Sequence, residues 1–111
     1  MELNKSTQGN VAVISVSGRL DSRSAPAAQV YLEEAIDEYH LVVLDLGQML
    51  SLSSAGLRVL LLTYRQADRT GTSVTLAGVR PDTREVLTAT GFSNFFAMVD
   101  TVEDGVKALA V

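Results

Sequence analysis

The sequence predicts a single α/β domain over residues 1–111, built on a mostly parallel sheet. Segments with strand-like patterns alternate with segments of helical periodicity along the chain, and this alternation is typical of right-handed β-α-β units. The segment LVVLDL (41–46) is almost continuously apolar, as expected for a strand buried on both faces of a parallel sheet. We expect about five strands, an N-terminal antiparallel hairpin and about four helices.

The N-terminal part of the chain predicts a hairpin followed by a helix. Residues 11–16, VAVISV, are rich in Val and Ile, and a shorter candidate strand covers residues 2–7. The turn residues 8–10, Gln-Gly-Asn, separate the two, so they can pair as antiparallel strands. Gly18 is expected to end the second strand. After a loop, a helix is expected over 26–39, because its apolar residues recur at spacings of three and four.

The rest of the chain alternates between helices and strands after a loop over 47–54. The expected elements are a helix over 54–69, a strand over 73–79, a helix over 81–90 and a short strand over 96–99. Gly91 is expected to terminate the helix before it. Thr101 is expected to cap a last helix, with Asp104 three residues later in an imperfect capping box.

Composition excludes several classes of function. The chain has no cysteine and one histidine, His40, so we expect no disulfide, no metal site and an intracellular, cytoplasmic setting. The first ten residues lack the apolar segment of a signal peptide, and no apolar run is long enough to span a membrane. With a net charge of −4, the chain is a poor candidate for binding nucleic acid.

The helix expected over 54–69 has two chemically different sides. One side is expected to meet the sheet and contains Leu57, Leu60, Leu61, Tyr64 and Ala67. The other side is expected to face solvent and contains Arg58, Leu62, Arg65, Gln66 and Arg69. Leu62 therefore lies among three arginines. It is either an incidental exposed leucine or a contact for a partner protein, since interfaces favour arginine around an apolar centre.

Two serines precede the apolar part of this helix. Ser53 and Ser54 are both natural N-cap residues, whose hydroxyl accepts a hydrogen bond from a free backbone N–H. Ser54 lies four residues before Arg58 and therefore on the same flank of the helix. A group attached to Ser54 would lie beside Arg58 and at the positive end of the helix.

Catalysis by these serines is not expected. His40 precedes the strand at 41–46, whereas Ser54 follows that strand, so the two should lie about 20 Å apart at opposite edges of the sheet. The chain has no G-x-S-x-G elbow and no phosphate-binding glycine loop. Asp21 and Asp45 lie near the C-terminal ends of strands and could share an edge with Ser54, as acid-base groups or as solvated loop acids. We expect no enzymatic activity and no cofactor.

Five short motifs occur in a fixed order over nearly the whole chain. They are Gly18-Arg19-Leu20-Asp21, Ala25-Pro26, Asp45-Leu46, Ser53-Ser54-Ala55-Gly56-Leu57 and Thr90-Gly91-Phe92. With these motifs the chain resembles a STAS domain of the anti-sigma factor antagonist family. The resemblance implies the STAS fold.

The resemblance also implies a phosphorylation switch. In this family the unphosphorylated protein binds an anti-sigma factor that is a serine kinase, and thereby releases a sigma factor. The kinase then phosphorylates a serine, and a metal-dependent serine phosphatase reverses the modification. Alignment to the family signature D-S-S-G-L makes Ser54 the first candidate acceptor and Ser53 the second. Ser53 stands where the family often has Asp, and Ala55 where it often has a second Ser.

The same resemblance suggests a binding surface, because Asp21 matches a family position near the kinase contact. The expected partner-binding residues are Asp21, Ser53, Ala55, Gly56, Arg58 and Leu62. An alternative role is a stand-alone STAS subunit of a phospholipid-transport ABC system or of a sensory assembly. A small nucleotide-binding protein is a third and less favoured possibility.

Overall fold

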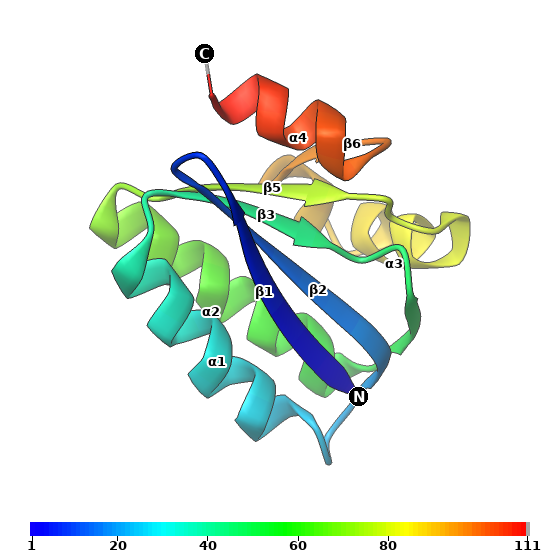
Figure 1. Cartoon of the computed structure of the whole chain (residues 1–111). Helices are drawn as coiled ribbons and strands as arrows, with labels where there is room; N and C mark the ends of the chain where they lie inside the picture. Colours follow the sequence, from blue (N-terminus) through cyan, green and yellow to red (C-terminus); the bar gives the residue numbers. More distant parts are fainter. Residues whose placement is uncertain (111) are drawn as a thin grey trace.

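A computed structural model describes residues 1–110 and shows a six-stranded sheet with helices on both faces (Figure 1). The strands are β1 (Glu2–Gln8), β2 (Val11–Leu20), β3 (Leu41–Asp45), β4 (Met49–Leu52), β5 (Ser73–Ala77) and β6 (Ala97–Val99). The helices are α1 (Ala25–Glu38), α2 (Ser54–Thr70), α3 (Pro81–Ala89) and α4 (Val102–Leu109), with a 3₁₀-helix, η1 (Phe92–Asn94), after α3. The described residues contain no helix that is both long and apolar enough to cross a membrane.

The sheet is parallel apart from its first strand. Its order is β1-β2-β3-β5-β6, and only β1 pairs antiparallel, with β2. This topology confirms the predicted fold class and the N-terminal hairpin. The sixth strand, β4, lies in the segment expected to be a loop, and it pairs with the far end of β2, from Gly18 to Leu20. The expectation that Gly18 ends the second strand is therefore wrong, because β2 continues to Leu20.

Two buried clusters explain why the central strands are so apolar. On β2, Ala12, Ile14 and Val16 belong to a large cluster that includes buried residues of α1 and α2. Val11 and Val13 alternate with them and belong to a small cluster that α4 covers. Figure 1 shows α1 and α2 on one face of the sheet and α4 on the other. A strand between two such layers buries both of its faces, as the parallel-sheet prediction required.

The buried face of α2 is rotated from the predicted one, toward α1. Leu60 and Ala67 are buried as expected, but Leu57, Leu61 and Tyr64 are only half-buried. The buried residues of α2 are Gly56, Val59, Leu60, Thr63, Gln66 and Ala67. α2 buries one side against the sheet and a second side against α1. A helical wheel divided into one buried and one exposed side does not represent this second buried side.

Gln66 shows this rotation most clearly, because it was expected to face solvent. It is 9% exposed, and its Nε2 donates to the backbone oxygen of Glu33 at 3.0 Å and to Oδ1 of Asp37 at 2.9 Å, both on α1. The three arginines of the predicted outer side are exposed, whereas Leu62 among them is half-buried. The expectation of a fully solvent-directed Leu62 is therefore wrong.

The predicted helix ends are confirmed where local chemistry determines them. Gly91 follows α3 with a φ of +82°, the left-handed conformation of a helix stop. The hydroxyl of Thr101 accepts a hydrogen bond from the backbone N–H of Asp104 at 3.1 Å and caps α4.

Candidate functional site

The first turn of α2 is attached to the last residue of β2. The backbone N–H of Ser53 donates to the carbonyl oxygen of Leu20 at 3.0 Å, and the Ser53 hydroxyl is 3.3 Å from the same oxygen. Gly56 packs so closely here that a Cβ atom on it would lie 2.5 Å from the Leu20 oxygen. The position of the helix start is therefore set by β2.

The two serines at this helix start have different surroundings. Ser53 is the N-cap residue: its Oγ accepts a hydrogen bond from the backbone N–H of Gly56 at 3.3 Å, and its side chain is half-buried. Ser54 is the first residue of α2 and is exposed. Its hydroxyl has no hydrogen-bond partner among residues 1–110. The expectation that Ser54 could also cap the helix is wrong, and its hydroxyl is accessible.

Several positive groups lie at the start of α2 and in the adjacent loop, which also contains the Asp21 carboxylate. Free N–H groups and the helix dipole give the start of a helix a partial positive charge, and the first turn of α2 contains no acidic residue. Arg58 is exposed one turn further along. Arg19 and Arg23 are exposed at the end of β2 and in the following loop, and none of the three forms an ion pair within the described chain. This end of the molecule is suited to accept an added negative charge.

Asp21 orders the loop that follows β2. Its Oδ1 accepts hydrogen bonds from the backbone N–H of Arg23 at 3.0 Å and of Ser24 at 3.3 Å. These bonds, first that from Arg23 and then that from Ser24, lower the pKa of the Asp21 carboxyl below its ordinary value. The Ser24 hydroxyl also donates to the backbone oxygen of Arg19 at 2.8 Å. Asp21 directly follows Leu20, so the structure brings its loop and the Ser53 cap together.

Asp45 is not part of this group. Asp45 pairs with Ser15 on β2, five residues before Leu20. At about 3.3 Å per residue, Asp45 lies about 16 Å from Leu20 along the strand direction. Its Oδ1 accepts a hydrogen bond from the backbone N–H of Gly47 at 3.0 Å and so stabilises the turn after β3. The expected grouping of Asp45 with Ser54 is wrong, because β2 and β4 extend the sheet beyond the end of β3.

His40 lies at the opposite end of the sheet from Ser54. It precedes Leu41, which pairs with Val11 at the start of β2, whereas Ser53 is bonded to Leu20 at the end of that strand. The nine intervening steps correspond to about 30 Å, so the predicted placement at opposite edges of the sheet is confirmed, with a larger separation than the expected 20 Å, because β2 extends beyond β3. Among the described residues no group of three His, Cys, Asp or Glu side chains is arranged to hold a metal ion.

The remaining predicted contact residues differ in accessibility. Arg58 is exposed, Ala55 and Leu62 are half-buried, and Gly56 is buried. Gly56 therefore serves close packing and does not present a surface, contrary to the expectation. Leu50 of β4 is 58% exposed and was not among the expected contact residues. No sequence pattern identified it, because Leu50 and Ser51 are both exposed and the four residues of β4 do not alternate between buried and exposed positions.

The chain is similar to known proteins over nearly its whole length. Residues 2–105 match the STAS domain family. The Bordetella bronchiseptica protein BtrV, named as an anti-sigma factor antagonist, is 30% identical over 109 residues, covering 97% of this chain and 94% of that protein.

Two solved structures have the same fold. The crystal structure of an anti-sigma factor antagonist from Mycobacterium paratuberculosis is 27% identical, with a TM-score of 0.89, and the match covers 99% of this chain and 94% of that one. The Bacillus protein SpoIIAA in its phosphorylated form is 16% identical, with a TM-score of 0.75, over 96% of this chain and 98% of that one. The match to the family over residues 2–105 and the relationship to BtrV show that the chain belongs to the STAS domain family, among its anti-sigma factor antagonists.

Proposed function

We propose that the chain binds a serine-kinase anti-sigma factor through the end of β2, β4 and the start of α2, and thereby releases a sigma factor. The observation that carries this proposal is the pair of serines: Ser53 forms the cap, which leaves the exposed hydroxyl of Ser54 available to the kinase. Phosphorylation of Ser54 ends the binding. SpoIIAA has been solved in unphosphorylated and phosphorylated forms, which supports a switch of this kind.

The proposed phosphate acts at the interface and leaves the fold intact. A phosphoserine adds about −1.5 to −2 charge at pH 7. At the first residue of α2, beside Arg58, the folded domain tolerates this charge. The same charge repels an acidic partner surface and prevents the close approach that the small, half-buried Ala55 otherwise allows.

The proposed contact surface contains Asp21, Ser54, Arg58 and Leu62, and we add Leu50 as an exposed apolar contact. A metal-dependent serine phosphatase acting on phosphorylated Ser54 would complete the cycle. In this role the chain is a binding protein rather than an enzyme. It would act in the cytoplasm, together with the kinase and the sigma factor.

The acceptor is tested by incubating the protein with its anti-sigma factor kinase and ATP and mapping the phosphate by mass spectrometry. We expect phosphate on Ser54 in the wild type and in Ser53→Ala, and none in Ser54→Ala. Ser54→Ala should retain the wild-type melting temperature, because its hydroxyl bonds to no described residue. Phosphate on Ser53, or on neither serine, would contradict the assignment.

The effect of the charge is tested with Ser54→Asp and the matched control Ser6→Asp, which adds the same charge to an exposed serine of β1. Ser54→Asp should weaken kinase binding at least tenfold, measured by calorimetry, with a melting temperature within about 2 °C of the wild type. Ser6→Asp should change neither property. Equal loss of binding in both variants would show that net charge, and not the position of Ser54, controls the interaction.

A further inference from the structure

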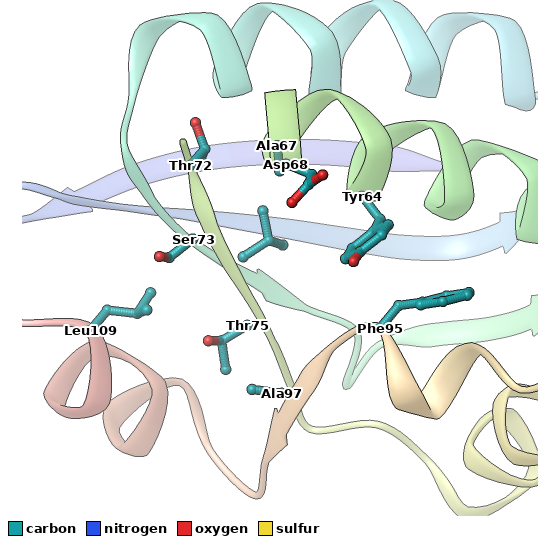
Figure 2. Close-up of a pocket in the computed structure, with 10 residues that line it drawn as sticks. Tyr64, Ala67, Asp68, Thr72, Ser73, Thr75, Phe95, Ala97 and Leu109 are labelled. Atoms are coloured by element: carbon teal, nitrogen blue, oxygen red, sulfur yellow. The ribbon is translucent and has the colours of Figure 1, made fainter. Parts of the chain in front are cut away.

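A cavity lies at the other end of α2, away from Ser54. It has a volume of about 340 Å³, opens to solvent and is lined by α2, β5, the segment after η1 and Leu109 at the end of α4 (Figure 2). Asp68, which lines it, is fourteen residues after Ser54, or about 20 Å along the helix at about 1.5 Å per residue. The cavity is therefore separate from the proposed kinase surface.

The cavity exists because β6 is shorter than β5. β5 pairs with β3 from Ser73 onward, but β6 joins β5 only from Thr75. No strand of the described chain therefore covers the outer edge of β5 before Thr75. Ser73 on the unpaired part of this edge and Thr75 at the first pair with β6 both line the cavity, and Figure 2 shows them on the side opposite the two aromatic rings.

Two aromatic rings form one wall of the cavity. Tyr64 and Phe95 stack with their centroids 4.9 Å apart and an angle of 26° between the rings. Tyr64 also contacts Phe96 edge-on, at 5.7 Å between centroids. Phe96 is buried, whereas Phe95 remains 43% exposed although it stacks on Tyr64. The rings therefore present aromatic surface to whatever enters.

Among the described residues, one charged side chain lines the cavity, and it is negative. Asp68 lies one turn after Tyr64 on α2, and Figure 2 shows its carboxylate directed into the same space. No lysine, arginine or histidine lines the cavity, and Asp68 makes no ion pair within residues 1–110. A carboxylate beside aromatic rings favours an organic cation, because the carboxylate attracts the charge and the rings contact the apolar part of the molecule.

We propose that this cavity binds a small organic amine whose apolar or aromatic body packs against Tyr64 and Phe95 and whose ammonium group pairs with Asp68. The volume is that of a small-ligand site, and the lining combines an apolar wall with few polar groups, as such sites do. The hydroxyl groups of Ser73 and Thr75 provide further acceptors for the N–H groups of the amine. This inference is independent of the proposed kinase interaction.

The test is an NMR titration of the ¹⁵N-labelled full chain with three probes of one shape: phenethylammonium, neutral 2-phenylethanol and anionic 3-phenylpropionate. We expect phenethylammonium to shift the amide signals of Asp68, Val74 and Phe95, with affinity at least fivefold higher than that of the alcohol. The anion should cause no shifts there. Equal affinity for amine and alcohol, or shifts confined to other regions, would overturn the proposal.

Three variants test the carboxylate and the aromatic wall of the cavity separately. Asp68→Asn should reduce the affinity for the amine to that of the alcohol, whereas Asp100→Asn, which removes an exposed carboxylate outside the cavity, should leave it unchanged. Phe95→Ala should weaken the amine and the alcohol by similar factors. Both side chains are exposed, so the variants should fold, as the remaining NMR signals will show. Unchanged amine affinity in Asp68→Asn would refute the role of the carboxylate.

Discussion

The two ends of α2 each depend on a glycine, for different physical reasons. At the start of the helix, a Cβ on Gly56 would lie 2.5 Å from the backbone oxygen of Leu20 and 2.7 Å from the side chain of Leu52. At the other end, Gly71 has a φ of +72°, and nothing lies within 4 Å of where its Cβ would be. The start of α2 is thus positioned by tertiary contact with β2 and β4, and its end by local backbone conformation.

Gly56→Ala should have the largest effect. Because the neighbouring atom is a backbone oxygen that also accepts the hydrogen bonds of Ser53, the helix start must move, at a cost of about 3 kcal/mol in the free energy of unfolding. Urea denaturation measures this cost. Phosphorylation of Ser54 in the folded fraction should also slow. A variant as stable as the wild type would show that the contact at the end of β2 is looser than the structure indicates.

Gly71→Ala should cost less, about 1–2 kcal/mol, since only the left-handed backbone conformation disfavours alanine. Asparagine tolerates this conformation better, so Gly71→Asn should recover part of the stability. The same replacement at Gly56 should recover nothing, because there the obstacle is space. If asparagine rescued both positions, or neither, the distinction between the two ends of α2 would fail.

Ser53→Ala should reduce the free energy of unfolding by about 1 kcal/mol, the usual contribution of an N-cap. Ser53→Thr keeps the hydroxyl and should lose much less. Ser54→Ala, at the adjacent position, should stay within about 0.5 kcal/mol of the wild type. An equal loss at the two positions would mean that they share the capping role.

Asp21→Asn should have the smallest effect, and it should depend on pH. The folded-state pKa of Asp21 is lowered, chiefly by the N–H of Arg23 and then that of Ser24. The ionised carboxylate therefore contributes stability above its unfolded pKa, and this contribution disappears as the pH falls through the lower folded-state pKa. Urea denaturation from pH 7 to pH 2 should show the two proteins converging at low pH. A constant difference would indicate that the charge of Asp21 has no role.

Most elements with local signals could be predicted from the sequence. The apolar run beginning at Leu41 indicated a doubly covered strand, and Gly91 and Thr101 marked helix ends that the structure confirms. The missed element, β4, is only four residues long, and its buried and exposed positions do not alternate. Its strand conformation depends on pairing with residues 18–20 of β2, and no periodicity within so short a segment reveals a distant partner.

In the candidate site, too, local features could be predicted from the sequence, whereas features that depend on tertiary contacts could not. The motif containing Ser53 and Ser54 marked the start of a helix, and their neighbour Arg58 could be placed on the flank of Ser54 by its spacing alone. Which serine forms the cap could not be predicted, because both are good caps and the choice depends on where the helix begins. That point is determined by the two bonds from Ser53 to the Leu20 oxygen.

The sequence by itself determined the fold class, the order of the elements and the position of the serine pair at a helix start, because hydrophobic periodicity and capping chemistry are local properties. Only the tertiary structure decided that Gln66 is buried, that Asp45 lies apart from Ser54 and that Ser54 keeps an exposed hydroxyl. Each of these depends on contacts between segments distant in the chain: α1 against α2, the extension of β2 beyond β3, and the attachment of the helix start to Leu20.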